Sequence, residues 1–160
     1  MSAKKKAHPL QADIDALLNA DHTDPFGFLG MHITEEGKVV VRTLQLSAER
    51  VEVIDVDSGK VVADLKLVDP AGVFEGNVPR RKERFPYRLR VSWNGVSVDM
   101  EDPYRFPTIM GEMDAWLFGE GKHLRPFEFL GAHRREVDGV SGAAFLVWAP
   151  DAKRVSVVGE

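Results

Sequence analysis

The chain has 160 residues and a mass of 17.8 kDa. That length holds one ordinary domain, or one small domain and part of another, and excludes a TIM-barrel enzyme, which needs roughly 200 residues or more. A formal charge of −4 gives no reason to expect nucleic acid as a partner, and the lack of cysteine excludes thiol catalysis and cysteine-bound zinc. With 44 % hydrophobic residues but no apolar run near about 18 residues, the sequence predicts a soluble cytoplasmic protein with no membrane partner.

Residues 1–24 are predicted to form a basic tail followed by one short helix. A single apolar stripe at helical spacing comprises Leu10, Ile14, Leu17 and Leu18. Pro9 suits the first helical position, and the helix is expected to end before Asp24, because a residue that precedes proline disfavours helical geometry. The stripe indicates a face that docks on the rest of the domain; a helix that binds a partner is the alternative.

From residue 38 to residue 101 the apolar period changes from that of a helix to that of a strand. Apolar residues alternate with polar ones in three rows: Val61, Ala63, Leu65, Leu67; Phe85, Tyr87, Leu89, Val91, Trp93; and Val96, Val98, Met100. Further strands are expected at 38–46, 51–56 and 73–78, with turns at 57–60, 69–72 and Asn94-Gly95. Six short strands in this pattern predict a mostly β fold, an antiparallel Ig-like β-sandwich.

Part of this sequence occurs twice. The segment Pro25-Phe26-Gly27-Phe28-Leu29-Gly30-Met31-His32 recurs 101 positions later as Pro126-Phe127-Glu128-Phe129-Leu130-Gly131-Ala132-His133, and 48–53 resembles 152–157. We therefore expect an N-terminal sandwich over 25–106, a linker over 107–125 and the start of a second, truncated sandwich over 126–160. Because a sandwich that stops after two or three strands leaves an open apolar face, the chain is expected to be a fragment of a longer protein.

The sequence resembles the N-terminal region of bacterial 1,4-α-glucan branching enzymes, which belong to the α-amylase superfamily. The resemblance covers residues 10–160 in order and rests on His22-Thr23-Asp24-Pro25-Phe26, Pro79-Arg80-Arg81-Lys82, Asp102-Pro103-Tyr104-Arg105-Phe106, Met113-Asp114-Ala115-Trp116-Leu117, Gly121-Lys122-His123-Leu124-Arg125-Pro126 and Phe145-Leu146-Val147-Trp148-Ala149-Pro150-Asp151-Ala152. Such enzymes cut an α-1,4-glucan chain and transfer the freed segment to a 6-hydroxyl in glycogen biosynthesis.

The resemblance implies a role for this chain without catalysis of its own. It implies an N-terminal sandwich, a glycogen-binding-type sandwich and then a catalytic barrel that carries the reactive carboxylates and lies outside this chain. The partners it implies are an α-glucan, reached through the full-length protein, and the missing catalytic domain. No catalytic residue, metal ligand or cofactor site is expected in the chain itself.

The tryptophans are the candidates for glucan contact, because sugars stack on flat indole faces. Trp93 is in phase with the apolar row of its strand, so burial in the core competes with a role as a sugar platform. Trp116 lies in the expected linker and is interpreted as an anchor between the sandwiches, with glucan contact as the alternative. Trp148 is expected to pack within the second copy.

The polar candidates have simpler structural interpretations. Asp99, Glu101 and Asp102 suit a polar strand face and a turn better than a catalytic or metal cluster. His32 and His133 occupy equivalent repeat positions and are predicted to make the same structural hydrogen bond. The basic run 80–84 fits a solvated loop or a surface that docks on the catalytic domain. Besides an accessory role in a branching enzyme, a stand-alone carbohydrate-binding or protein-interaction sandwich remains open.

Overall fold

The computed structural model describes residues 10–152 and 155–158, so the basic tail and Pro9 lie outside the described residues. The chain divides into two compact units, Met1–Arg105 (unit 1) and Phe106–Glu160 (unit 2). Each unit is described by itself.

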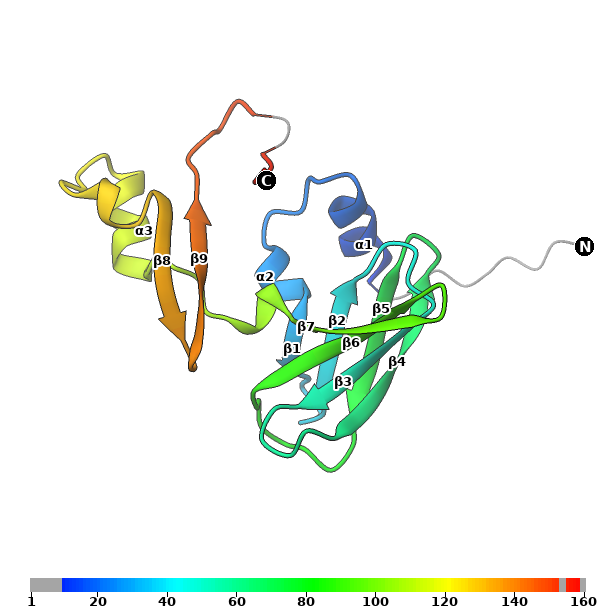
Figure 1. The fold of residues 1–160 in the computed structure, drawn as a ribbon. Coiled ribbons are helices and arrows are strands. Elements are labelled where there is room, and N and C mark those ends of the chain that lie inside the picture. The colour runs from blue at the N-terminus through cyan, green and yellow to red at the C-terminus, as the bar shows by residue number, and fades with distance from the viewer. Residues whose placement is uncertain (1–9, 153–154, 159–160) are drawn as a thin grey trace, which may run out of the picture. The chain divides into compact units, whose positions relative to one another are not determined.

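Unit 1 is mostly β, as the alternating pattern predicts (Figure 1). Its helices are α1 (Gln11–Leu18) and the single turns α2 (Pro25–Phe28) and η1 (Pro103–Arg105). Its strands are β1 (Gly30–Ile33), β2 (Val39–Leu44), β3 (Arg50–Asp55), β4 (Val61–Asp69), β5 (Val73–Val78), β6 (Tyr87–Trp93) and β7 (Val96–Glu101). They form one antiparallel sheet in the order β1-β2-β5-β4-β3-β6-β7, which curls into a sandwich-like fold and confirms the predicted fold class.

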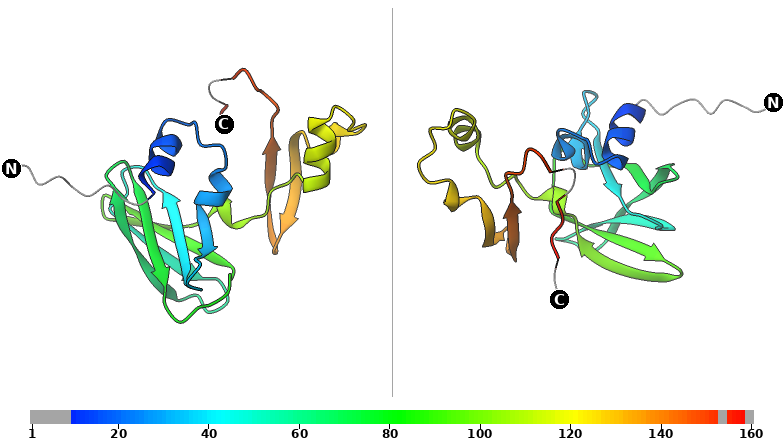
Figure 2. Two further views of the ribbon diagram at one scale, coloured as in Figure 1. Left: turned by 180° about the vertical axis from the view of Figure 1, so that it is seen from behind. Right: turned by 90° about the horizontal axis from the view of Figure 1, so that it is seen from above.

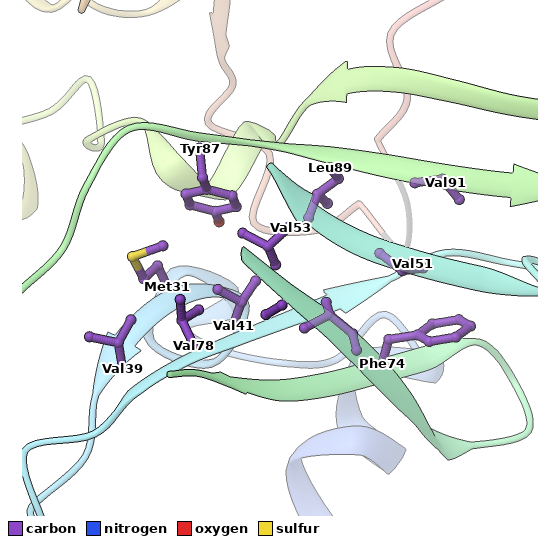
Figure 3. Close-up of a cluster of buried hydrophobic side chains, with 12 residues drawn as sticks. Met31, Val39, Val41, Val51, Val53, Phe74, Val78, Tyr87, Leu89 and Val91 are labelled. Atoms are coloured by element: carbon purple, nitrogen blue, oxygen red, sulfur yellow. The ribbon is translucent and has the colours of Figure 1, made fainter. Parts of the chain in front are cut away.

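Strand β4 joins the two layers of this sandwich. Its first half pairs with β3, from Val61 to Leu65, and its second half pairs with β5, from Lys66 to Asp69. The predicted apolar row of β4 therefore does not keep one environment: Ala63 and Leu65 are buried, whereas Leu67 is exposed. The core lies between the two layers, and its buried side chains come from both of them (Figure 3): Met31, Val39, Val41, Val51, Val53, Ala63, Leu65, Phe74, Val78, Tyr87, Leu89 and Val91.

The expectation of six strands in this unit is wrong, because β1 adds a seventh. Its four residues lie inside the repeated segment and pair with β2 from Gly30↔Arg42 to Ile33↔Val39. A strand of this length has too few positions to show an alternating pattern. The predicted turn after β6 is confirmed, since Asn94 and Gly95 both have positive φ (48° and 78°) and connect the directly paired Trp93 and Val96.

Helix α1 docks on unit 1, as its apolar stripe predicts. Ile14 is fully buried, and Leu10 and Leu17 pack in the same cluster with side chains from α2, the residue after it, the sheet and η1: Phe28, Leu29, Leu44, Val68, Val73 and Tyr104. Leu44 ends β2 and Val73 begins β5, so the helix covers that end of the layer that contains β1, β2 and β5 (Figure 2). Leu18, the last residue of the stripe, is exposed.

Unit 2 contains α3 (Glu112–Gly119), η2 (Pro126–Glu128) and a hairpin of β8 (Gly131–Val137) and β9 (Val140–Leu146). Its element order repeats the beginning of unit 1. Helix α3 lies 101 positions after α1, and η2 and β8 stand where α2 and β1 stand. The structural repeat therefore begins at the helix, well before the Pro-Phe segment that reveals it in the sequence.

The ends of α1 and α3 have the same hydrogen bonds. Asp21 N–H bonds to the Ala16 carbonyl (2.8 Å) as Lys122 N–H bonds to the Leu117 carbonyl (2.9 Å). In each copy the residue just before this amide has a positive φ angle. That residue is Ala20 (56°) in the first copy and Gly121 (66°) in the second. A Cβ atom raises the energy of this conformation by roughly 1 kcal/mol, which glycine avoids.

We therefore predict that Ala20→Gly stabilises unit 1. Ala20 is exposed, so its methyl group contributes no packing, and relief of backbone strain should raise the free energy of unfolding by about 0.5 kcal/mol. Urea denaturation of the chain, followed by circular dichroism, measures the effect. Ala16→Gly is the matched control: within α1 the same substitution should destabilise by about 1 kcal/mol. Equal effects at both positions would contradict the prediction.

Candidate docking and glucan-contact residues

Two histidines organise the loop after each helix in the same way. The Nδ1 atom of His22 accepts a hydrogen bond from the Asp24 amide (3.1 Å), and Nδ1 of His123 accepts one from the Arg125 amide (3.1 Å). Each ring also packs on the phenylalanine six positions later: His22 lies 5.7 Å from Phe28, and His123 lies 4.8 Å from Phe129. These histidines fix the turn that leads from the helix into the repeated Pro-Phe segment.

The other ring nitrogen of each histidine faces an aspartate of the preceding helix. His123 Nε2 lies 3.0 Å from Asp114 of α3, and His22 Nε2 lies 3.5 Å from Asp13 of α1. Sequence analysis missed this pair, although Asp and His recur at the same spacing in both copies. The arrangement ties each helix to its loop and is a structural element of the repeat.

The predicted hydrogen bond of the later histidine pair is confirmed. His32 Nε2 donates to the Leu29 carbonyl (2.8 Å), and His133 Nε2 donates to the Leu130 carbonyl (2.9 Å). All four of these histidines therefore have structural partners. Among residues 10–152 and 155–158, no group of three metal-ligating side chains comes together.

In unit 2 the helix packs through aromatic rings. Phe118 of α3 contacts Phe129 and Trp148 edge to face, with centroid distances of 6.0 and 5.1 Å. Phe129 is buried, whereas Trp148 is 65 % exposed. We call Phe118, His123, Phe129 and Trp148 the aromatic cluster of unit 2. Other large apolar side chains of this unit are also exposed, and they include Met113, Leu124, Phe127, Phe145 and Val147.

The two candidate glucan-contact tryptophans lie in different environments. Trp93 ends β6, is partly buried against the core of unit 1 and donates from Nε1 to the Leu46 carbonyl (3.0 Å). Trp116 lies on α3, is 57 % exposed and has Lys122 Nζ 5.9 Å from its ring centroid. Each tryptophan belongs to its own unit, and of the two only Trp116 is an exposed residue.

The acidic residues near the end of unit 1 have structural partners. Asp99 pairs with Arg90, and the Arg90 side chain lowers the pKa of the Asp99 carboxyl. Glu101 pairs with Arg88 and with Arg105 (3.1 Å).

One residue of the basic run 80–84 is held within unit 1. Arg81 binds the buried Asp55, and its guanidinium group lies 4.5 Å from the centroid of Phe85. Less of that run is therefore free to dock on another domain.

A buried polar pair anchors the segment that ends unit 1. The Tyr87 hydroxyl donates to Asp102 (2.5 Å), whose other oxygen accepts the Tyr104 amide (3.0 Å). Burial raises the pKa of the Asp102 carboxyl, against the opposing effect of the hydrogen bond from Tyr87. This pair holds η1 against β1, where a Cβ on Gly30 would lie 2.7 Å from the Tyr104 carbonyl oxygen.

The fold and these contacts define unit 1 as an antiparallel β-sandwich capped by a helix. No helix in the described part of the chain is long and apolar enough to cross a membrane. The family model of the alpha-1,4-glucan branching enzyme GlgB, N-terminal domain, matches residues 10–104, which is more than half of the chain. The chain therefore belongs to this family of branching-enzyme N-terminal domains.

Comparison with solved structures finds more distant similarities to this chain. The catalytic module of the pneumococcal glycogen-degrading virulence factor SpuA is 26 % identical over 48 % of this chain and 12 % of that chain, with a TM-score of 0.35. The GBS pullulanase SAP in complex with maltotetraose is 19 % identical over 74 % of this chain and 14 % of that chain, with a TM-score of 0.40. This chain thus spans less than a sixth of either length, and the family assignment rests on the family match alone.

We predict that Tyr87→Phe destabilises unit 1 by about 1–3 kcal/mol at neutral pH, because it removes a donor from a buried carboxylate. Since the pKa of Asp102 is raised in the folded state, acidification through that pKa protonates the carboxyl preferentially in the native protein and favours folding. Tyr87→Phe removes the hydrogen bond that opposes this rise, so the variant should gain more stability than the unaltered chain on acidification, and the difference between them should shrink toward about pH 4.

Urea denaturation at both pH values measures this difference. Tyr104→Phe is the matched control, because it removes a hydroxyl from a half-buried ring and keeps the backbone amide that bonds to Asp102. A deficit of Tyr87→Phe that stays constant or grows on acidification would contradict the assignment of Tyr87 as the donor that supports the ionised Asp102.

Proposed function

We propose that this chain is the non-catalytic N-terminal part of a cytoplasmic 1,4-α-glucan branching enzyme. In that role it helps to position an α-glucan for the catalytic domain and to set the length of the transferred chain. The observation that carries the proposal is the family match over residues 10–104. The ion-paired acidic side chains of unit 1 support a role outside the chemical step, because glycosidic transfer with retention needs two carboxyl groups free to act on the substrate.

The domain boundaries remain part of this proposal. In it, residues 25–106 form the complete first sandwich and residues 126–160 begin a second, glycogen-binding-type sandwich. The repeated order of helix, turn and strand in unit 2 supports this division. Its many exposed apolar side chains also fit a domain that packs on further polypeptide in the complete enzyme.

We predict that the 160-residue chain has no branching activity and that the longer protein containing it does. The chain is too short to include a barrel with the reactive carboxylates. Branching of amylose lowers the colour that amylose gives with iodine, so this assay on both proteins at equal concentration tests the proposal. Loss of colour with the 160-residue chain, or none with the longer protein, would contradict it.

A stand-alone carbohydrate-binding or protein-interaction sandwich is the second candidate function. The observation that favours sugar contact is the exposed indole of Trp116 with Lys122 beside it. An exposed indole offers the flat apolar face on which a sugar ring stacks, and an adjacent ammonium group can donate to sugar hydroxyls. Glucan binding without branching activity in any form of the protein would favour this second function.

The two tryptophans should respond oppositely to substitution. We predict that Trp93→Ala lowers the free energy of unfolding by about 2–4 kcal/mol, because it removes ring packing against the core. Trp116→Ala should leave the melting temperature nearly unchanged and weaken retardation of the protein in glycogen-containing gels. Thermal melts and affinity gels on both variants measure this contrast. A stable Trp93→Ala protein with lost retardation would make Trp93 the glucan platform instead.

A further inference from the structure

Strand β7 forms one edge of the unit 1 sheet, and its backbone there is unprotected. Among the described residues only β6 pairs with it. Sheet edges are normally kept from pairing by shortness, a bulge, proline, lysine or a charge that points inward. The residues of β7, Val-Ser-Val-Asp-Met-Glu, include neither proline nor lysine, and their register with β6 has no irregularity. The backbone of β7 is therefore open to a further strand.

The opposite edge of the same sheet, β1, is protected. It has only 4 residues, and η1 lies against its first residue, where a Cβ on Gly30 would be 2.7 Å from the Tyr104 carbonyl oxygen. A short strand with a covered end offers little backbone to a neighbour. Edge pairing by unit 1 is therefore expected at β7.

The row of β7 side chains on the core face of its layer is apolar and exposed. These residues lie directly opposite core-facing residues of β6, in the pairs Val96↔Trp93, Val98↔Val91 and Met100↔Leu89. Val91 and Leu89 are fully buried, whereas the β7 residues opposite them are exposed. The apolar face of this layer therefore extends past the part that the other layer covers.

The charged side chains on the other face of β7 are already paired within the sheet. Arg90 donates two hydrogen bonds to Asp99 (2.6 and 2.9 Å), and Arg88 donates to Glu101. Ser97 is the remaining member of this row. A strand that joins this edge therefore does not have to supply positive charge, although a carboxylate directly opposite Asp99 would be destabilising.

We propose that β7 pairs with β7 of a second copy of this chain, antiparallel and related by a two-fold axis through Val98. In this register Val98 faces Val98 of the second copy, Val96 faces Met100, and Ser97 faces Asp99. Apolar side chains meet on one face, and on the other the Ser97 hydroxyl donates to the Asp99 carboxylate. The proposal goes beyond the proposed function and does not depend on it, since it uses only unit 1.

Alternation and charge exclude the neighbouring registers. A shift by one residue sets the apolar row of one copy against the polar row of the other. An axis through Asp99 sets two carboxylates directly opposite each other. An axis through Ser97 pairs only residues 96–98 of β7, whereas the axis through Val98 pairs residues 96–100. The sequence of β7 is thus complementary to itself in one register, which favours a second copy as the occupant.

A single introduced cysteine tests this register, because the chain has no cysteine of its own. In Val98→Cys the two variant residues face each other across the axis with Cα atoms about 4.5–5.5 Å apart, a separation that a disulfide spans. Mild oxidation of the 160-residue chain should therefore convert most of it to a covalent dimer on a non-reducing gel. Val96→Cys is the matched control, because its counterpart lies roughly 14 Å away.

The facing residues Val96 and Met100 provide a second measurement. A mixture of Val96→Cys and Met100→Cys chains should form covalent heterodimers, although neither variant cross-links alone. A Val98→Cys chain that stays monomeric on oxidation overturns the proposal. Cross-linking of Val96→Cys alone as fast as that of Val98→Cys indicates random collision and also overturns it.

Sedimentation equilibrium measures the association without cysteine. One pair of short strands buries a small interface, so the average mass should rise from 17.8 kDa toward twice that value only between about 10 μM and about 1 mM. Val98→Asp should keep the chain monomeric, because it places two carboxylates at the axis. Leu67→Asp, at an exposed apolar residue of β4, is the matched control and should associate like the unaltered chain.

Two results of this measurement overturn the proposal. One is an unaltered chain that remains monomeric at about 1 mM, the upper end of the range expected for so small an interface. The other is an equal loss of association in Val98→Asp and Leu67→Asp, which assigns the contact to a surface other than β7.

Discussion

The hydrogen bonding of β4 to both layers is the constraint on which unit 1 depends. Because Val61–Leu65 pair with β3 and Lys66–Asp69 pair with β5, the two layers are one continuous sheet folded over itself. Such a sheet is closed at its fold and has two free strands, β1 and β7, at its ends. The side between these ends has to be closed by something other than backbone pairing.

The segment after β7 provides this closure, which explains why a carboxylate is buried in the protein. The chain turns at Asp102, and Tyr104 is placed against β1 at Gly30. Desolvation of Asp102 is unfavourable, and the Tyr87 hydroxyl with the Tyr104 amide compensates for it by hydrogen bonding. Tyr87 itself lies in the core among Met31 and Val53 (Figure 3), so one side chain links the core to the closing segment.

The sequence predicted well those features that depend on local pattern. The strands at 73–78 and 96–101, the turn at Asn94-Gly95 and the shared bond of His32 and His133 follow from alternation, turn chemistry and repetition. Features that depend on tertiary contact were not visible. The change of layer within β4 leaves no mark on its alternating row, and Tyr87 and Asp102 each suit their local element without indicating their contact.

The helix repeat was missed for a different physical reason. The apolar side chains through which α1 and α3 pack differ, with Ile14 and Leu17 in α1 and Phe118 in α3. Only the polar Asp and His of the helix-to-loop contact are retained, because a directional contact requires particular atoms at particular distances. Apolar packing requires only a suitable volume, so it tolerates exchange of a leucine for an aromatic ring when the facing side chains change as well. The two copies therefore keep the polar Asp–His contact and differ in the apolar side chains that pack beside it.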